Sequence, residues 1–255
     1  MKIRLDKLVV DLGLAASRER AQALILAGRV LVGEQKIDKP GTSVDAEAEV
    51  RMLGSDMKYV SRGGLKLEGA LKHWAIDLAG VACLDIGAST GGFTDCMLQH
   101  GAAAVLAVDT GYGQIAQKLR DDERVSLRER CNARLLAAGE LVVEAKGATF
   151  LAMDVSFISA TLVLPAVLKA IVPEGEAWVG TAVLLVKPQF EAGREAVGKG
   201  GIVRTAEARQ FAIDRVHDCV LAHGGHHTAI IDSPIHGMEG NHEYLLYAKF
   251  GEKQL

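Results

Sequence analysis

The sequence lacks the features that mark membrane-spanning, secreted and disulfide-built proteins. No stretch approaches the roughly 20 consecutive apolar residues that a membrane-spanning helix needs, and the first six residues lack the apolar core of a signal peptide. Cysteine is scarce and fits neither a metal clip nor a redox pair in its spacing; the four are Cys83, Cys96, Cys131 and Cys219. We therefore expect a cytoplasmic protein with reduced thiols and no membrane partner.

The chain also lacks a strong charge of one sign and has few aromatic residues. Its net charge is −3, so binding to nucleic acid requires a local concentration of positive charge. Residues 1–36 provide one, because they carry seven Lys and Arg against four acids, which is +3. Aromatic residues make up 5% of the chain, so extensive stacking platforms for bases are not expected. A nucleic acid would be held through shape and charge.

Histidine is clustered towards the C-terminus, but its spacing fits no zinc site. The cluster consists of His223, His226, His227, His236 and His242. We therefore expect no resident metal.

Residues 1–60 are predicted to form a small α+β domain. Leu5, Leu8, Val9 and Leu12 recur at helical spacing, and Ser17 can cap a second helix that runs to Gly28. Two short extended runs follow, at residues 30–32 and 49–52. Residues 58–72, dense in Lys and Arg, are interpreted as a basic joint to the second domain, residues 61–255.

From Val81 onward the pattern is that of a mostly parallel sheet covered by helices, because apolar runs ending in Gly or Asp alternate with helical segments. The fold class predicted is α/β and Rossmann-like. Seven strands are predicted, at residues 81–86, 104–109, 125–128, 149–154, 182–187, 228–231 and 244–250.

A glycine-rich loop follows the first of these strands and opens a helix, in the order Asp-Ile-Gly-Ala-Ser-Thr-Gly-Gly-Phe. Asp109 ends the next strand, where a carboxylate can bind both hydroxyls of a ribose. The loop departs from the dinucleotide pattern G-x-G-x-x-G and lacks the Gly-Lys-Ser/Thr of triphosphate-binding loops. S-adenosylmethionine is therefore the favoured cofactor, with tight packing of the turn as the alternative.

Charged residues stand at the carboxyl ends of two later strands, where α/β sheets place their chemistry. Asp154 closes the fourth strand, and Lys187 follows the apolar residues of the fifth. A lysine there is costly if buried without a partner, so a reactive role is favoured over an ion pair that only closes the sheet. Lys66 and Glu243 could meet these two only through the fold, and Glu239 competes with Glu243 as the second acid.

Five motifs, in this order along essentially the whole chain, closely resemble the TlyA family, also labelled haemolysin A. They are Ser-Arg-Gly-Gly-x-Lys-Leu, the Asp-Ile-Gly-x-Ser-x-Gly-Gly-Phe loop, Asp-Val-Ser-Phe-Ile-Ser, Lys-Pro-Gln-Phe-Glu and Gly-Asn-x-Glu-Tyr. The resemblance implies an S4-like RNA-binding domain joined to an FtsJ-like methyltransferase domain. It further implies S-adenosylmethionine-dependent methylation of ribose 2′-hydroxyls in ribosomal RNA, with cytidine in one or both subunits as the target.

The same resemblance assigns site residues. The catalytic Lys-Asp-Lys-Glu tetrad maps to Lys66, Asp154, Lys187 and Glu243. Cofactor positions map to Asp85, Gly87, Ser89, Gly91, Gly92, Phe93 and Asp109, with a looser match around Asn132. Phosphate contacts are expected from Arg4, Arg18, Arg20, Arg29, Lys58 and Arg62, which would otherwise be solvated surface charges.

Three alternatives to a ribosomal RNA methyltransferase stay open at this point. An RNA-binding protein could carry a degenerate methyltransferase domain, and a small-molecule methyltransferase would leave the first domain without a role. A membrane-active haemolysin conflicts with the absence of apolar segments.

Residues 193–203 are predicted to be either a loop that closes over substrate or a plain connector.

Overall fold

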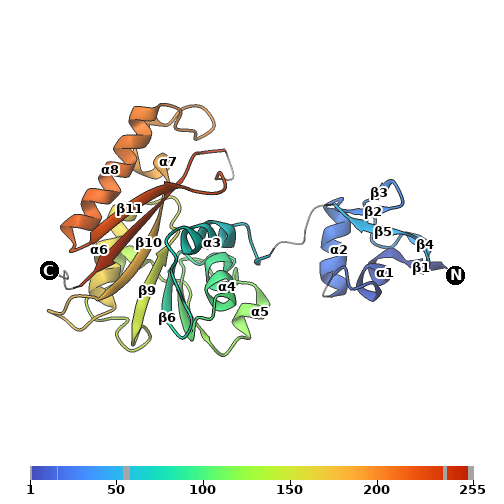
Figure 1. Cartoon of the computed structure of the whole chain (residues 1–255), viewed down its shortest axis with the longest axis horizontal. Coiled ribbons are helices and arrows are strands. Elements are labelled where there is room, and N and C mark those ends of the chain that lie inside the picture. The colour runs from blue at the N-terminus through green and yellow to red at the C-terminus, as the bar shows by residue number, and fades with distance from the viewer. Residues whose placement is uncertain (1, 16, 54–57, 238–239, 252–255) are drawn as a thin grey trace. The chain divides into compact units, whose positions relative to one another are not determined.

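The computed structural model describes residues 2–15, 17–53, 58–237 and 240–251. The chain divides into two compact units, Met1–Lys58 and Tyr59–Leu255 (Figure 1). The division falls two residues before the domain boundary expected from the sequence. The first unit has one hydrophobic core, and the second unit has two large ones.

The first unit packs two helices over short strands. Helix α1 (Leu5–Asp11) and helix α2 (Arg18–Leu26) bury a shared apolar core that includes Leu5 and Ile25. The Ser17 hydroxyl accepts a hydrogen bond from the Arg20 backbone N–H at 3.2 Å, which caps α2 as the sequence predicts.

The strands of the first unit form two small sheets. One pairs β1 (Lys2–Arg4) with β4 (Ser43–Asp45), and the other has the order β3–β2–β5. The strands of the second sheet are β2 (Val30–Val32), β3 (Gln35–Ile37) and β5 (Val50–Met52). The sequence predicted β2 and β5, whereas β1, β3 and β4 were not foreseen.

The second unit is built on a seven-stranded sheet in the order β11–β12–β10–β9–β6–β7–β8. Only β12 runs antiparallel to its neighbours β10 and β11, so the predicted mostly parallel, Rossmann-like sheet is confirmed. The strands are β6 (Ala82–Ile86), β7 (Ala104–Val108), β8 (Val125–Arg128), β9 (Ala148–Met153), β10 (Gly180–Val186), β11 (His226–Asp232) and β12 (Tyr244–Phe250).

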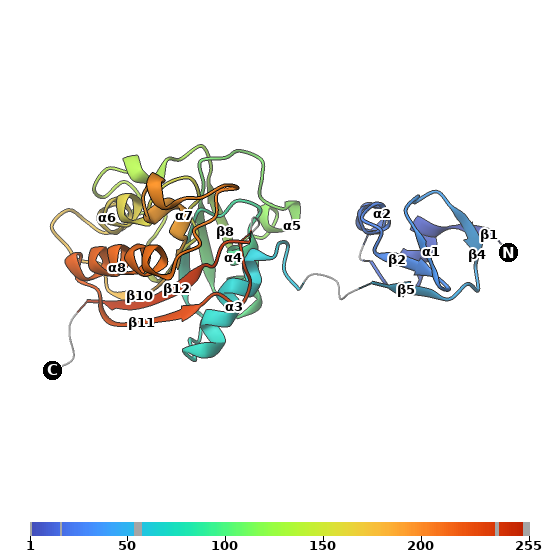
Figure 2. The same cartoon turned by 90° about the horizontal axis from the view of Figure 1, so that it is seen from above.

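Helices cover both faces of this sheet, because alternate strand residues feed two separate cores. Leu84 and Ile86 face the core that includes α6 (Ala160–Ala170) and α8 (Ala206–Ala222). Cys83, which directly precedes Leu84, faces the core of α3 (Gly63–His73) and α4 (Gly92–Gln99). Figure 2 shows α8 and α3 on opposite sides of the strands. The short helices are α5 (Gln117–Arg120), η1 (Ala133–Leu135), α7 (Pro188–Glu191) and η2 (Arg194–Ala196).

The interpretation of residues 58–72 as a joint is wrong over most of its length. Residues 63–73 form α3, which packs against α4 and buries Lys66 and Leu67. Tyr59 is buried as well, and the Val60 backbone N–H donates to Asp95 Oδ2 at 2.8 Å. Within the described parts of the chain, none of the helices is long and apolar enough to span a bilayer.

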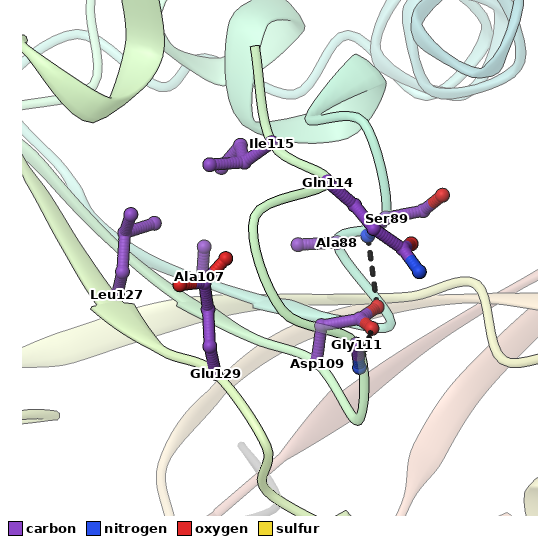
Figure 3. A pocket seen from close by; sticks show the side chains of 9 residues that line it. All are labelled: Ala88, Ser89, Ala107, Asp109, Gly111, Gln114, Ile115, Leu127 and Glu129. Carbon is purple, nitrogen blue, oxygen red and sulfur yellow. Dashed lines mark hydrogen bonds between the residues drawn. The ribbon is translucent and has the colours of Figure 1, made fainter. Parts of the chain in front are cut away.

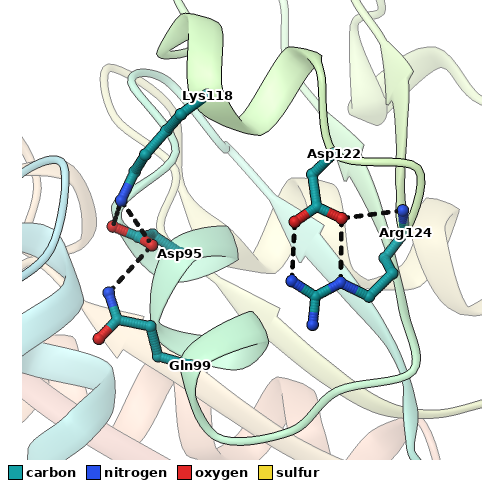
Figure 4. Close-up of polar contacts among 5 residues, drawn as sticks. All are labelled: Asp95, Gln99, Lys118, Asp122 and Arg124. Atoms are coloured by element: carbon teal, nitrogen blue, oxygen red, sulfur yellow. Dashed lines mark hydrogen bonds and ion pairs between the residues drawn. The ribbon is translucent and has the colours of Figure 1, made fainter.

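Asp95 thus anchors the first residues of the second unit to α4. Its carboxylate also accepts hydrogen bonds from Lys118 at 2.9 and 3.0 Å and from Gln99 at 3.0 Å (Figure 4). Asp95 is buried, so these donors replace the water that its charge would otherwise need.

Candidate active site

A cleft opens where β6, β7, β8 and β9 end, with a volume of about 390 Å³. This is the position where open α/β sheets bind their ligands, and the volume suits a nucleoside-sized molecule. The walls come from the segments that follow these strands. They include Gly87, Ser89, Asp109, Gly111, Gln114, Asn132, Arg134, Asp154, Ser156 and Phe157.

The loop after β6 brings its backbone against the segment after β9. Gly87 has φ +89°, and a Cβ atom there would lie 2.4 Å from the carbonyl oxygen of Asp154. Any side chain at this position would push the two segments apart. Gly91 has φ +94°, and its missing Cβ leaves room for Leu119. The tight turn that the glycine pattern predicts is therefore present after β6.

Asp109 is held with both carboxylate oxygens in place at the cleft wall. The Ser89 backbone N–H donates to Oδ2 at 2.8 Å, and the Gly111 backbone N–H donates to Oδ1 at 2.6 Å (Figure 3). Each carboxylate oxygen can accept a second hydrogen bond. Asp109 is therefore fixed in orientation and still able to bind a pair of hydroxyls.

Asp85, the first acid of the glycine-rich loop, points to the α4 side of the sheet. Its Oδ2 accepts hydrogen bonds from the Thr94 backbone N–H at 2.8 Å and the Thr94 hydroxyl at 2.6 Å. Its Oδ1 is buried without a partner among the described atoms. Complete burial raises the pKa of Asp85 to about 7, against the opposing effect of the Thr94 hydrogen bonds.

Four of the seven predicted cofactor positions do not line the cleft. Besides Asp85 and Gly91, Gly92 packs against Ser61, and Phe93 is buried in the core that α3 and α4 share. Gly87, Ser89 and Asp109 do line it. The motif thus combines residues that face the cleft with residues that hold the loop in place.

Lys187 contacts two residues that line the cleft, Asp154 and Ser156. It caps α7 immediately after β10, and its Nζ is 2.5 Å from Asp154 Oδ1 and 2.6 Å from Ser156 Oγ. The side chain is 8% exposed. The partner expected for a lysine in this position is therefore Asp154, and Asp154 itself lines the cleft.

Lys66 and Glu243 form a second buried ion pair. Lys66, from α3, places its Nζ 2.5 Å from Glu243 Oε2, across 177 positions of sequence. Glu243 is 4% exposed. A Cβ atom at Gly237 would lie 2.6 Å from Glu243 Oε1, so glycine at 237 leaves the space that this carboxylate occupies.

The register of the sheet brings the two ion pairs to the same edge. Val186, the last residue of β10, pairs with Tyr244, the first residue of β12. The residues next to this pair, Lys187 and Glu243, therefore stand at adjacent strand ends. Residues named from four distant motifs converge as two Lys–carboxylate pairs beside the cleft.

Sequence reasoning missed two residues of the segment after β9. The Ser156 hydroxyl accepts a hydrogen bond from Lys187 Nζ at 2.6 Å, and Phe157 is 92% exposed with φ +63°. The Phe157 ring contacts Phe190, with centroids 5.5 Å apart. A bulky residue at positive φ is uncommon and costs free energy, which marks this position as one selected for more than packing. Its motif was recognised, but only Asp154 was assigned a role.

Two of the predicted phosphate-binding residues share one buried acid in the first unit. Arg4 and Arg18 both contact Asp6 Oδ2, at 2.9 and 3.2 Å, and Gln22 donates to the same oxygen at 2.9 Å. Hydrogen bonding to Arg4 is the largest cause that holds the pKa of Asp6 far below its ordinary value. The two guanidinium groups remain about half exposed and are fixed in orientation by Asp6.

The other predicted phosphate-binding residues are distributed over both units. Arg20 is half-buried on α2, and the Arg29 Nε donates to the Leu53 carbonyl oxygen at 3.0 Å. Lys58 is exposed. Arg62 is exposed at the start of α3 and donates to the His236 carbonyl oxygen at 3.2 Å.

The remaining predicted features are placed as follows. In residues 193–203, Val203 is buried and its backbone N–H donates to the buried Asn241 at 3.0 Å, so this end of the loop is tethered. Asn132 lines the cleft and caps η1. Glu239 lies outside the described residues. Among the residues that are described, no three His, Cys, Asp or Glu side chains are grouped as metal ligands.

Comparison with known proteins matches both units. The model of the FtsJ-like methyltransferase family matches residues 59–250, and the model of the S4 domain matches residues 3–50. The 16S/23S rRNA (cytidine-2′-O)-methyltransferase TlyA of Mycobacterium tuberculosis is 42% identical over 251 residues, which cover 97% of this chain and 90% of that protein.

Two further relatives extend the match. Hemolysin A of Brachyspira hyodysenteriae is 39% identical over 245 residues, covering 96% of this chain and 99% of that protein. The solved structure of a Streptococcus thermophilus protein, named provisionally as a hemolysin, has 41% identity and a TM-score of 0.72, covering 99% of this chain and 90% of that one. The chain therefore belongs to the TlyA and haemolysin A family, in which an S4 domain precedes an FtsJ-like methyltransferase domain.

Proposed function

We propose that this protein transfers a methyl group from S-adenosylmethionine to a ribose 2′-hydroxyl of ribosomal RNA, with cytidine as the target nucleoside and the cytoplasm as the place of action. The observation that carries this proposal is the ion pair between Lys187 and Asp154, a residue that lines a nucleoside-sized cleft. The relative from Mycobacterium tuberculosis is named for this reaction on both ribosomal RNAs.

The residues of the cleft suit S-adenosylmethionine. Asp109 would bind the two ribose hydroxyls of the cofactor, because its oxygens are fixed by Ser89 and Gly111 and keep acceptor capacity. Gly87 allows close approach, since a Cβ there would collide with Asp154. Asp85 does not line the cleft; its contacts with Thr94 join the loop after β6 to α4 and hold that loop in place for the cofactor. When bound, the cofactor supplies an electrophilic methyl group.

The reaction requires the ribose hydroxyl to lose its proton while it is held in line for attack. Lys187 is the group that we assign to the reacting oxygen, either taking the proton as the neutral amine or holding the developing negative charge as the ammonium. Asp154 and Ser156 fix the Lys187 ammonium from two directions. The Lys66–Glu243 pair fixes the adjacent strand end and shapes the field there.

The target nucleotide must leave its helix to present the hydroxyl, and an exposed ring then helps to hold its base. Phe157 offers such a ring at the cleft. The arginines of the first unit would contact phosphates. An RNA-binding protein with a degenerate second domain remains the alternative, and an open cleft with its charged pairs intact speaks against it.

The test uses purified bacterial ribosomal subunits and S-adenosylmethionine labelled with tritium in its methyl group. We expect label in ribose of the ribosomal RNA, at a position that fragment mapping identifies. Lys187→Ala should lower turnover at least about 100-fold, the lower range for a positioned acid–base group. Calorimetry should show S-adenosylmethionine binding within a few-fold of the unchanged protein.

Lys169→Ala is the matched control, because Lys169 is an exposed lysine in the last turn of α6 and does not line the cleft. Its turnover should equal that of the unchanged protein. Near-normal turnover in Lys187→Ala would refute the role of Lys187. Absence of saturable cofactor binding in the unchanged protein would refute the enzyme and favour the RNA-binding alternative.

A further inference from the structure

Two exposed imidazole rings meet beside the catalytic edge of the sheet. The ring centroids of His236 and His242 are 4.5 Å apart, with 43° between the planes. Backbone hydrogen bonds close the connection between β11 and β12 around them, from Gly237 N–H to the Asn241 carbonyl at 3.0 Å and from Ser233 N–H to the Glu243 carbonyl at 2.9 Å. The backbone thus brings the two histidines together.

The pair is adjacent to groups already assigned to the site. His242 directly precedes Glu243, whose carboxylate is buried against Lys66. On the other side, Arg62 donates to the backbone carbonyl of His236 at 3.2 Å, so its exposed guanidinium lies at the same loop. Three exposed nitrogen-bearing side chains, Arg62, His236 and His242, therefore border the Lys66–Glu243 pair.

The charges around the pair favour an anion. From α3, Arg62 and Lys66 are positive; Glu243 is negative but turned inward to Lys66. From β11, Asp232 is exposed at the strand end that pairs with Tyr244. Two protonated imidazoles in contact repel one another unless an anion binds both. A phosphate group, with several acceptor oxygens, is the ligand that satisfies two imidazoles and a guanidinium at once.

We propose that His236, His242 and Arg62 bind a backbone phosphate of the substrate RNA next to the target ribose. The inference rests on the proposed function and deepens it by assigning a phosphate site. S-adenosylmethionine has no phosphate, so a phosphate bound at this edge would come from the RNA and not from the cofactor. Histidine, unlike arginine and lysine, is a side chain whose charge changes within the physiological pH range, so pH dependence of RNA affinity is the test that distinguishes this contact.

The experiment compares the unchanged protein with the double variant His236→Gln, His242→Gln. Affinity for purified ribosomal subunits is measured at pH 6.0 and pH 8.0 at constant ionic strength. The unchanged protein should bind about tenfold more tightly at pH 6.0, and the double variant should show no such difference. At pH 6.0 its plot of log affinity against log salt should be shallower by about 1, the effect of one lost phosphate contact.

A matched control exists in the same sheet. His226 and His227 also form a ring pair, with centroids 5.0 Å apart. They lie at the opposite end of the β11–β12 ladder, because His226 pairs with Lys249 whereas Asp232 pairs with Tyr244. The variant His226→Gln, His227→Gln should keep the full pH difference in RNA affinity.

Cofactor affinity and methyl transfer at pH 8.0 separate this inference from the proposed function. The double variant should bind S-adenosylmethionine normally and keep its kcat, with the loss confined to KM for RNA. A double variant that retains the pH difference, or a control that loses it equally, overturns the phosphate site while the methyltransferase stands. An unchanged protein that methylates no ribosomal RNA overturns both.

Discussion

Asp85, in the strand that leads into the glycine-rich loop, has a carboxyl pKa well above its ordinary value. It is fully buried, it has two hydrogen bonds from Thr94 on one oxygen, and its other oxygen has no partner among the described atoms. Burial outweighs the hydrogen bonds and raises its pKa to about 7. A charge at this position therefore costs stability whenever the site holds no compensating donor.

The consequence is a specific pH dependence of stability. Between about pH 4 and pH 7 the folded protein holds a proton on Asp85 that the unfolded chain has lost, so this group's contribution falls as pH rises through that window. Asp85→Asn has no proton to lose and keeps an acceptor for Thr94. It should gain stability relative to the unchanged protein between pH 5 and pH 8, by up to about 4 kcal/mol at 1.4 kcal/mol per pKa unit.

Urea unfolding followed by tryptophan fluorescence measures this difference in the second unit alone, because both tryptophans, Trp74 and Trp178, lie there. Asp77→Asn, at an exposed aspartate of the same unit, serves as the control and should track the unchanged protein at both pH values. Equal stability differences between Asp85→Asn and the unchanged protein at pH 5 and pH 8 would contradict the raised pKa.

At the scale of elements, residues 187–191 contact residues 154–160 along their length. Lys187 contacts Asp154 and Ser156, and Phe190 contacts Phe157. At the far end, the Ser159 hydroxyl donates to Glu191 Oε2 at 2.5 Å, and the Ala160 backbone N–H donates to Oε1 at 2.7 Å. Glu191 therefore fixes the start of α6, and with it the loop that carries the proposed catalytic acid.

We expect Glu191 to act as a positioning residue. Glu191→Ala leaves the buried Ala160 N–H without a partner, at a cost of about 1–3 kcal/mol, and should lower kcat about tenfold or more. Glu191→Gln keeps an acceptor for Ala160 and a donor for Ser159, so it should restore kcat to within a few-fold. The measurement is steady-state methylation of ribosomal subunits at saturating RNA, together with the melting temperature.

Rescue by glutamine distinguishes positioning from acid–base chemistry, which would be lost in both variants. Glu195→Ala, at an exposed glutamate just after α7, is the matched control and should be silent. A lower melting temperature in Glu191→Ala with unchanged kcat would reduce Glu191 to a purely structural role.

The elements that the sequence predicted are those whose local pattern decides their structure. The strands of the second unit were foreseen within one or two residues, because most of them are apolar runs between turn residues. In the first unit, β1, β3 and β4 have three residues each and mix charged with apolar side chains, so only pairing with a partner strand defines them. Helix α3 was hidden because Lys66 and Glu68 suggest exposure, while both are buried against distant or neighbouring partners.

The residues of the candidate site also divide into those that a local pattern predicts and those that only the fold brings together. Glycine spacing and strand-end acids located the cleft, because turns and strand ends are local features. The contact between Lys66 and Glu243 spans 177 positions, and the shared use of Asp6 by Arg4 and Arg18 depends on how α1 and α2 pack. Such contacts arise only when the chain is folded, so residue patterns alone could not assign them.

For the whole molecule, we propose that the first unit supplies RNA affinity and the second unit supplies the chemistry. The first unit carries Arg4, Arg18, Arg20 and Arg29, whereas the residues that line the cleft and both ion pairs belong to the second unit. Each cation that neutralises a phosphate releases counterions, which lowers log affinity by about 0.7–0.9 per contact for each unit of log salt. The net charge of −3 does not prevent this, because the effect is local.

The expected result is a steep salt dependence of ribosomal subunit binding. If most of the six proposed cations contact phosphates, the slope of log affinity against log salt should lie between about −3 and −5. Arg20→Gln combined with Arg29→Gln should make the slope shallower by up to about 2 and leave kcat at saturating RNA unchanged, because neither residue lies in the unit that carries the cleft. Cofactor affinity, measured by calorimetry over the same salt range, should stay nearly constant. A slope flatter than about −1 for the unchanged protein would mean that these side chains are solvated surface charges and that the S4 domain recognises RNA by other contacts.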